Sequence, residues 1–238
     1  MGRDQRRPGR RMGIWAVGLM VLGAVLFVGA GAGVRFFLAD EYSHQFIPAH
    51  AMEPAYSPGD EVWFRRVAPQ EVRRGDAVLA TPPASWGIGG DAFKRVIALG
   101  GDRLSWAKGD ATLTLNGKPL VEPYVKDPAI PAMAPFDVTV PEGRMFVMGD
   151  NRWDSVDSLV MAATYGNDGT LPLSAVRGVP TEMPTEVLVL GALGALGGNA
   201  FLVGGGLGIA SLVARRRAEK AARNAVAAGS VHEAAASS

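Results

Sequence analysis

Two uncharged and mostly apolar runs lie near the two ends of the chain, at residues 12–34 and 187–214. They contain 23 and 28 residues, respectively. A helix needs roughly 20 apolar residues to cross the hydrocarbon core of a bilayer, so both runs are long enough. The pattern therefore predicts a transmembrane helix at each end of the chain, with residues 40–186 forming a unit between them.

Each run also has a competing interpretation. The first could be a cleavable signal peptide, but the apolar stretch of such a peptide is usually about 7–15 residues long, which favours an uncleaved anchor. The second contains eight glycines and could be a glycine-rich buried or disordered tail. Its spacings Gly194-xxx-Gly198 and Gly204-xxx-Gly208 are typical of helices that pack closely within lipid. The Ala- and Ser-rich residues after Arg223 are expected to be disordered.

The middle of the chain has a different pattern. Short apolar or alternating stretches, bounded by Gly, Asp or Pro, predict β-strands at residues 61–65, 77–80, 95–99 and 145–148. A further strand at 112–115 leads into Asn116 and Gly117, a pair that accepts the positive φ angles of a tight hairpin turn. Seven prolines between positions 82 and 135 exclude long helices from much of this region. The expected fold is a mainly β unit with one membrane helix at each end.

The distribution of charged residues predicts on which side of the membrane each segment lies. Residues 40–186 carry 13 Lys and Arg against 20 Asp and Glu, whereas the rest of the chain carries 11 against 3. Cationic flanks of membrane helices tend to stay in the cytoplasm. We therefore expect a basic cytoplasmic tail at 1–11, spans at 12–34 and 187–214, an extracytoplasmic domain at 40–186, and a basic, Ala-rich cytoplasmic tail at 215–238. The acidic middle argues against nucleic acid as a partner.

Metal and disulfide chemistry find little support in the composition. The chain has no cysteine, which excludes disulfides and thiolate metal sites. Its three histidines, His44, His50 and His232, are too scattered to predict a zinc centre. We therefore expect neither a metal nor another cofactor.

Four segments of the middle region, taken in order, carry the candidate chemistry. They read IPAHAMEP at 47–54, GDEVWF at 59–64 with RGDAV at 74–78, FKRVIALGGD at 93–102, and VPEG at 140–143 with MGDNRWDSVDS at 148–158. Together they resemble the boxes of the bacterial type I signal peptidase family, which are membrane-anchored serine peptidases with a Ser/Lys dyad. The resemblance covers nearly the whole middle region and implies a fold of antiparallel sheets.

The resemblance assigns roles to several residues. Lys94 stands at the position of the general base, and Ser155 would orient its amine. Lysine can act as a base when burial lowers its pKa, and the neighbouring Phe93, Val96 and Ile97 suit that. Without the motif, Lys94 would be interpreted as an edge lysine reaching for water. Asp157 would pair with Arg95 and brace the strand of the base. The remaining supporting residues implied by the resemblance are Asp150, Asn151, Arg152 and Ser158.

The nucleophile box departs from the family pattern. Ala51 occupies the position of the catalytic serine, and Ala49 occupies that of a serine that donates to the oxyanion. A missing oxyanion donor typically costs about 2.7–4 kcal/mol of transition-state stabilisation, and without the nucleophile no acyl-enzyme forms. His50 and Ser57 are weak substitutes. If this stretch is extended, the His50 side chain points away from that of position 51, and Ser57 lies up to roughly 20 Å along the chain.

Two functions of different classes therefore remain open. One is a signal-peptide endopeptidase that works through a displaced nucleophile or with low residual activity. The other is a non-catalytic pseudopeptidase that binds membrane-tethered export substrates or an active signal peptidase paralogue. In both cases the expected partners are signal peptides of exported preproteins and the lipid bilayer. Only 13 residues separate Leu38 from Ala51, which keeps the site near the outer membrane face.

Overall fold

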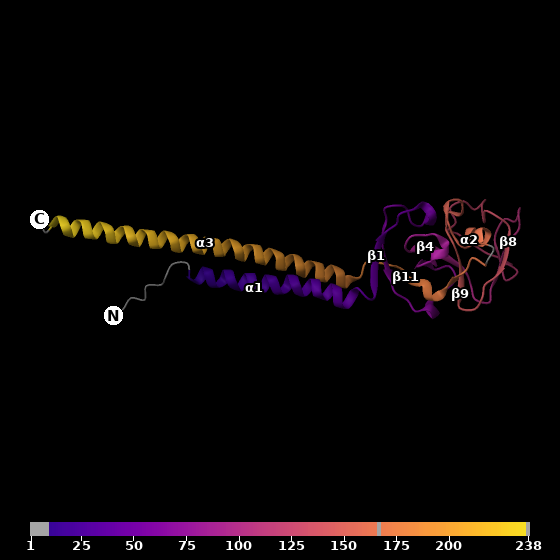
Figure 1. Ribbon diagram of the computed structural model, residues 1–238, viewed down its shortest axis with the longest axis horizontal. Coiled ribbons are helices and arrows are strands. Elements are labelled where there is room, and N and C mark those ends of the chain that lie inside the picture. The colour runs from indigo at the N-terminus through magenta and orange to yellow at the C-terminus, as the bar shows by residue number, and fades with distance from the viewer. Residues whose placement is uncertain (1–9, 166–167, 237–238) are drawn as a thin grey trace. The chain divides into compact units, whose positions relative to one another are not determined.

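The computed structural model describes residues 10–165 and 168–236, and these divide into two compact units. One unit comprises the two terminal segments, residues 1–38 and 184–238, and the other comprises residues 39–183. The helical unit contains α1 (Arg10–Gly33), a π-helical turn η1 (Val34–Leu38) and α3 (Thr185–Ala236). Figure 1 shows α1 and α3 side by side along the length of α1.

The two helices are in close contact through glycines. A Cβ atom added to Gly23 would lie 2.5 Å from the carbonyl oxygen of Gly197, and one added to Gly197 would lie 2.7 Å from that of Gly23. Gly204 is equally close to the backbone of Ala16, at 2.8 Å. Gly33 faces Leu190 near one end of the pair and Gly13 faces Arg215 near the other. The 20 residues between Gly13 and Gly33 rise about 30 Å, the thickness of a bilayer core.

Two expectations for this unit need correction. Of the four glycines in the predicted spacings, only Gly204 contacts the partner backbone closely, while the others have neighbours at 3.5–3.9 Å. The second close approach uses Gly197 instead. The tail expected to be disordered is helical as far as Ala236, which follows from the high helix propensity of its many alanines.

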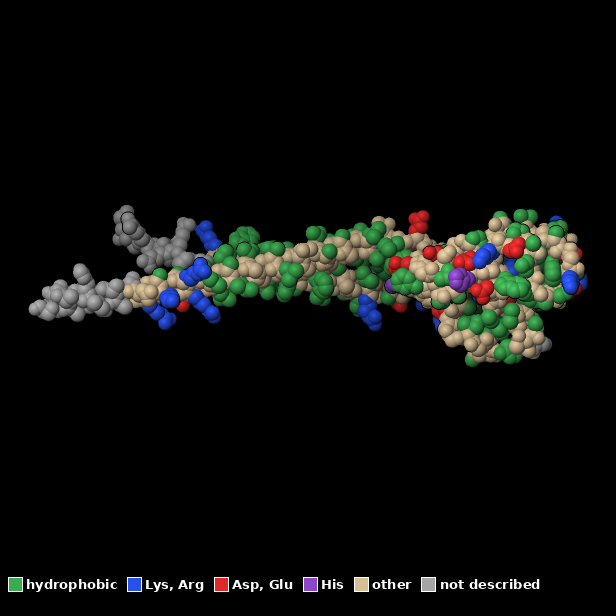
Figure 2. Space-filling view, turned by 90° about the horizontal axis from the view of Figure 1, so that it is seen from above, with side chains coloured by type: hydrophobic (Ala, Val, Ile, Leu, Met, Phe, Trp, Pro, Cys, Tyr) green, Lys and Arg blue, Asp and Glu red, His purple; other side chains and the backbone are tan. Residues whose placement is uncertain are grey.

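Both helices are apolar on their outer surfaces. The segments Arg11–Phe36 and Thr185–Asn224 are long and apolar enough to cross a membrane by length and composition, and little of either is buried within the protein. Figure 2 shows hydrophobic side chains over most of the paired helices, with Lys and Arg gathered toward the end that carries residues 215–223.

The second unit is built from two antiparallel sheets. Seven strands form the larger sheet in the order β1-β2-β11-β3-β4-β9-β10, and four form the smaller sheet in the order β7-β6-β5-β8. The strands are β1 (Tyr42–Phe46), β2 (Glu61–Arg65), β3 (Ala77–Ala80), β4 (Ala92–Leu99), β5 (Arg103–Trp106), β6 (Thr114–Leu115), β7 (Lys118–Pro119), β8 (Phe136–Thr139), β9 (Arg144–Met148), β10 (Leu171–Pro172) and β11 (Val176–Thr181). The mainly β fold with two long apolar helices is confirmed.

Short helical segments connect the strands. One is an α-helix, α2 (Ser158–Tyr165), and the others are 3-10 turns: η2 (His50–Met52), η3 (Pro69–Glu71), η4 (Ala84–Trp86), η5 (Arg152–Asp154) and η6 (Leu173–Ala175). The predicted hairpin turn is present between β6 and β7, with positive φ angles at Asn116 and Gly117.

The inner strands are buried on both faces, as their continuous apolar runs predict. Along β9, Met145 and Val147 face one hydrophobic cluster, while Phe146 and Met148 face another. The neighbouring strand β4 pairs with β9 through a register that sets Arg95 opposite Met148. Consequently the residues just after β9 lie beside the polar side chains of β4, and the candidate site forms there.

Candidate active site

The predicted nucleophile position lies in the short turn η2. Ala51 and Met52 are buried, and Met52 packs in a cluster with Phe93 of β4. The stretch is therefore a helical turn fixed against β4 and not an extended strand. His50 nevertheless points away, since its side chain is exposed and its Nδ1 lies 2.9 Å from Glu53 Oε1. Ala49, the predicted oxyanion position, is exposed and extended.

Lys94 lies on β4, opposite Val78 of β3. Its side chain is buried, and burial lowers the pKa of its ammonium from the ordinary lysine value. The carboxylates of Asp157, Asp154 and Asp150 oppose this shift but do not cancel it. Within the described part of the chain, the Lys94 ammonium has no hydrogen-bond partner. Burial thus shifts the balance of Lys94 toward its neutral amine, which is the form that can act as a base.

The residues that follow β9 contact the η2 turn that contains Ala51. The backbone N–H of Asn151 donates to the carbonyl of Ala51 at 3.0 Å, and its side-chain amide donates to the carbonyl of His50 at 3.1 Å. A Cβ on Gly149 would collide with the Ala51 carbonyl oxygen and with the Ser155 side chain. Only glycine therefore lets η2, Gly149 and Ser155 approach this closely. η2 also contacts β4, the strand that carries Lys94.

Ser155, predicted to orient the Lys94 amine, has a buried hydroxyl without a hydrogen-bond partner. It lies near enough to the Asp157 carboxylate to help lower the pKa of that carboxyl, although the geometry of a hydrogen bond is not met. The hydroxyl and the amine of Lys94 thus share the neighbourhood of Asp157 without a direct bond between them.

The predicted pairing of Asp157 with Arg95 is wrong. Asp157 precedes α2, where its carboxylate accepts from the backbone N–H groups of Leu159 and Gly149 at 3.1 and 3.2 Å. This is the arrangement of a helix N-cap. Burial raises the pKa of the Asp157 carboxyl, and the Gly149 N–H and the nearby Lys94 oppose that rise.

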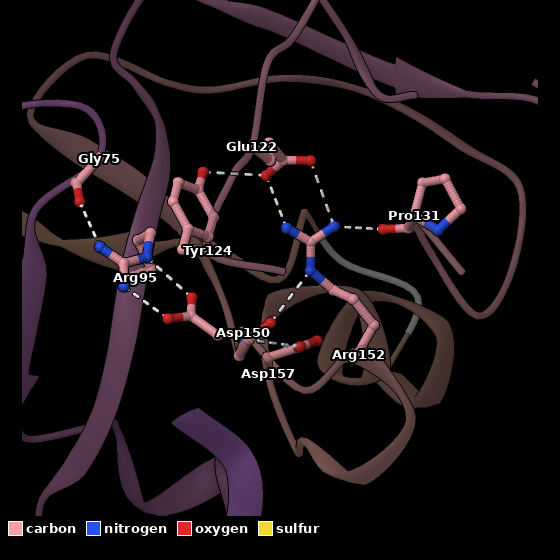
Figure 3. Close-up of polar contacts among 9 residues, drawn as sticks. Gly75, Arg95, Glu122, Tyr124, Pro131, Asp150, Arg152 and Asp157 are labelled. Carbon is pink, nitrogen blue, oxygen red and sulfur yellow. Dashed lines mark hydrogen bonds and ion pairs between the residues drawn. The ribbon is translucent and has the colours of Figure 1, made fainter. Parts of the chain in front are cut away.

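Arg95 instead pairs with Asp150, as Figure 3 shows. Two parallel hydrogen bonds of 2.7 and 2.5 Å join the guanidinium to the carboxylate. The register explains this choice. Met148 lies opposite Arg95, so Asp150, two residues farther on, projects from the same face. The guanidinium also donates to the carbonyl of Gly75 and lies 4.0 Å from the ring centre of Tyr124.

Arg152 forms a second buried ion pair (Figure 3). Its guanidinium bonds to Glu122 Oε1 at 2.6 Å and also donates to the carbonyls of Pro131 and Gly149. The hydroxyl of Tyr124 donates to the same Glu122 carboxylate at 3.0 Å. This network ties the proline-rich segment around residues 122–131 to the turn that follows β9.

Ser158 has a structural contact as well. Its buried Oγ accepts from the backbone N–H of Val147 at 2.9 Å, which links the start of α2 to β9. The structure therefore places Asn151 against η2 and Asp150 and Asp157 near Lys94, with Ala49 at the exposed edge, while Arg152 and Ser158 hold the surrounding turn. Among the described residues, no group of three or more His, Asp or Glu side chains is arranged to hold a metal ion.

This arrangement can be compared with known proteins. Residues 14–182 match the family described as "Signal peptidase, peptidase S26". The chain belongs to this family. A relative named Signal peptidase I, from Mycobacterium tuberculosis, is 32% identical over 229 residues that cover 74% of each protein. A Probable signal peptidase I from Mycobacterium leprae is 29% identical over 229 residues, covering 72% of this chain and 76% of that one.

A solved structure is also similar to this S26 chain. It is the crystal structure of a signal peptidase I from Enterococcus faecalis V583, with 29% sequence identity. The match covers 47% of this chain and 97% of that one, with a TM-score of 0.37. Family membership and the two long apolar helices together support a membrane protein.

Sequence reasoning about this S26 chain missed several residues beside the site. Glu122 and Tyr124 hold the two arginines, but single polar residues in a proline-rich loop carry no pattern that predicts their partners. Lys126 bonds to Glu53 at 2.6 Å and so fixes the turn after η2. An open cavity of about 670 Å³ adjoins η2 and includes the exposed indole of Trp153 in its wall.

Proposed function

We propose that this chain engages the signal peptides of exported preproteins as a non-cleaving member of its family, with Ala51 at the position of the missing nucleophile. The family and its relatives named signal peptidase I support a role in signal peptide processing. The observation that carries the proposal is the contrast at the site. Position 51 presents only a buried methyl group, whereas Lys94, on the strand that η2 contacts, is buried with a lowered pKa.

The chemistry requires an oxygen at this point. In a Ser/Lys mechanism the lysine amine takes the hydroxyl proton while the serine oxygen bonds to the scissile carbonyl carbon. The peptide C–N bond then breaks, the proton passes to the leaving amine, and water hydrolyses the ester. An alanine methyl group can form no ester. Lys94 therefore has no adjacent hydroxyl at position 51 to activate.

The two neighbouring side chains offer no evident replacement. The imidazole of His50 is exposed and bonded to Glu53, on the outer side of η2. Ser57 belongs to the next turn, where its backbone N–H donates to Asp60. Binding of a peptide needs no nucleophile, however. The cavity beside η2 and the edge strands of the sheet offer room and backbone groups for an extended peptide.

The decisive experiment compares preprotein cleavage by the purified full chain with cleavage by Ala51→Ser. We expect no turnover by the natural chain and measurable turnover by the variant, which Lys94→Ala in the same background abolishes. Ala49→Ser alone should be inert, because it adds a donor without a nucleophile. Combined with Ala51→Ser, it should raise the rate about 10²–10³-fold above that of the single variant.

Binding provides the second readout. A crosslinkable signal peptide should label the natural chain and Ala51→Ser to the same extent, because the added hydroxyl does not change the peptide-binding strands. Turnover by the natural chain that is lost on Lys94→Ala would reject the non-cleaving function and support the endopeptidase alternative. Absence of both turnover and peptide labelling in all variants would reject the proposed substrate class. Retention of an active family member on the immobilised chain would support the paralogue-binding alternative.

We further propose that both spans cross the membrane and that both termini are cytoplasmic, with residues 40–186 outside. The supporting observation is the basic composition of the flanks against the acidic middle. The chain has no natural cysteine, so single cysteines can report the topology. A membrane-impermeant maleimide should label Lys108→Cys in intact cells but not Arg216→Cys. The reverse labelling would contradict this topology.

A further inference from the structure

A cavity of about 1070 Å³ lies between α1 and α3, within the helical unit. Met20 and Gly208 line one end of it, and Arg215 and Glu219 line the other. Its walls are therefore apolar over one part and charged over the rest. A cavity of this kind suits a molecule that has an apolar chain and a charged head.

The charged end coincides with the ends of both apolar runs. The first uncharged run begins at residue 12, and the second ends at residue 214. Gly13 of α1 faces Arg215 of α3, because a Cβ on Gly13 would lie 2.9 Å from Arg215 Nη2. The two runs thus end at the same level along the helix pair. A bilayer that covers both runs sets this end of the cavity at its polar boundary.

Two opposite charges are available there. Arg215 and Glu219 are four residues apart on α3, a spacing that brings side chains onto one face of a helix. Both line the cavity, yet within the described part of the chain neither makes an ion pair with the other or with another residue. The Arg215 guanidinium lies back against the backbone of α1 at Gly13. A bound headgroup can therefore satisfy both charges at once.

We propose that this cavity binds one phospholipid whose headgroup carries a phosphate and a primary ammonium group. The guanidinium of Arg215 donates to the phosphate, the ammonium donates to the carboxylate of Glu219, and an acyl chain lies along Ile14, Val17 and Leu212. Phosphate and ammonium lie two carbons apart in such a headgroup, so that one molecule reaches both side chains. The proposal concerns the helical unit alone and does not depend on what happens at position 51.

Other abundant headgroups fit less well. A glycerol headgroup brings a negative charge without a cation, which leaves the Glu219 carboxylate uncompensated beside the phosphate. A choline headgroup has a positive charge, but its quaternary nitrogen has no N–H to donate to Glu219. Arginine is suited to the phosphate itself, because its planar guanidinium donates two parallel hydrogen bonds. The pair of charges accordingly selects for an aminophospholipid.

The test uses native mass spectrometry of the full chain, released from nanodiscs that contain equal amounts of phosphatidylethanolamine, phosphatidylglycerol and phosphatidylcholine with identical acyl chains. We expect phosphatidylethanolamine to be retained in preference to the other two lipids. Arg215→Gln should lower the retention of phospholipid about tenfold, the effect of losing one charge-assisted hydrogen-bonded contact. Glu219→Gln should retain bound lipid but lose the preference for phosphatidylethanolamine.

Arg216→Gln is the matched control, because it removes the same charge from the next position, which does not line the cavity. It should leave both retention and preference unchanged. Equal losses on Arg215→Gln and Arg216→Gln would show a general attraction of lipids to basic residues and would overturn the site. A preference for phosphatidylglycerol in the natural chain, or for phosphatidylethanolamine that survives Glu219→Gln, would overturn the assigned headgroup.

Discussion

The two sides of the candidate site differ in what their residues contribute to the fold. On the side of the base, Asp150, Arg152, Asp157 and Ser158 are buried, and each has a hydrogen-bond partner in the surrounding structure. On the side of the nucleophile, Ala49 and Ala51 present no polar group. The residues that match the family pattern thus include several that support the fold, whereas the predicted nucleophile and oxyanion positions carry only methyl groups.

This difference limits what motif matching says about activity. A chain that no longer cleaves would keep Asp150 or Arg152, because losing either leaves a buried charge without its partner. Lys94 and Ser155 are the exceptions. The described residues give the amine of one and the hydroxyl of the other no hydrogen bond, although both lie near the Asp157 carboxylate. Under the proposed function, these two groups would be available to a bound peptide backbone.

The largest expected effect is the loss of protein stability when the buried ion pair between Arg152 and Glu122 is broken. Arg152→Ala removes the partner of Glu122, whose side chain is only 7% exposed, and should lower the free energy of unfolding by about 3–5 kcal/mol. Denaturant unfolding of the detergent-solubilised chain measures this. Arg103→Ala breaks the exposed pair with Asp137 and should leave stability near that of the natural chain. Equal losses of stability in Arg152→Ala and Arg103→Ala would contradict the expectation that the buried ion pair contributes more than the exposed one.

A smaller effect distinguishes two serines of the same motif. Ser158→Ala leaves the buried N–H of Val147 without its acceptor, which should cost about 1–3 kcal/mol. Ser155→Ala removes a hydroxyl that has no hydrogen-bond partner and should cost clearly less. The same unfolding measurement compares the two. If Ser155→Ala lost more stability than Ser158→Ala, the Ser155 hydroxyl would support the fold. Ser155 would then no longer differ from the buried residues that have hydrogen-bond partners.

The smallest expected effect concerns Lys94 and depends on pH. Lys94→Met should raise the free energy of unfolding by about 1 kcal/mol at neutral pH, because burial disfavours the Lys94 ammonium more than the nearby carboxylates favour it. Burial lowers the pKa of Lys94 in the folded chain, so between that value and the ordinary 10.5 the unfolded chain binds more protons. The stability of the natural chain therefore rises with pH across this window.

The advantage of Lys94→Met should accordingly shrink as the pH approaches the ordinary lysine value. Thermal unfolding at a series of pH values measures the difference, with Lys108→Met, at an exposed position, as the control. A loss of stability on Lys94→Met at neutral pH would mean that the amine supports the fold. Lys94 would then have a structural role, like the buried polar residues around it.

The strands and the helix pair were predictable because each follows a local period. Runs such as 77–80 and 145–148 are short and continuously apolar, which favours inner strands, and the Asn116-Gly117 pair favours a hairpin turn. The helical tail to Ala236 contradicts the expected disorder, because alanine has a high helix propensity even where few large apolar residues are present.

The polar pairs of the site were less predictable, since they depend on register. Asp150 can be identified as the partner of Arg95 in place of Asp157 only when the register between β4 and β9 is known. A sequence motif does not give that register. The contact of Glu122 with Arg152 joins segments 30 residues apart through a proline-rich loop. Such a contact arises from the path of the chain in space, so that no local spacing indicates it.

The close approach of Gly23 to Gly197 has a consequence for how the helical unit tolerates variation. Backbone atoms make this contact, so exchanges among large apolar residues on the outer faces should leave the pairing of the spans unchanged. A saturation screen for membrane insertion and abundance should therefore record intolerance at Gly23, Gly197 and Gly204 and broad tolerance at neighbouring lipid-facing positions. The outer surface of the two helices can therefore change to suit membranes of different composition, provided that glycine is kept at these three positions.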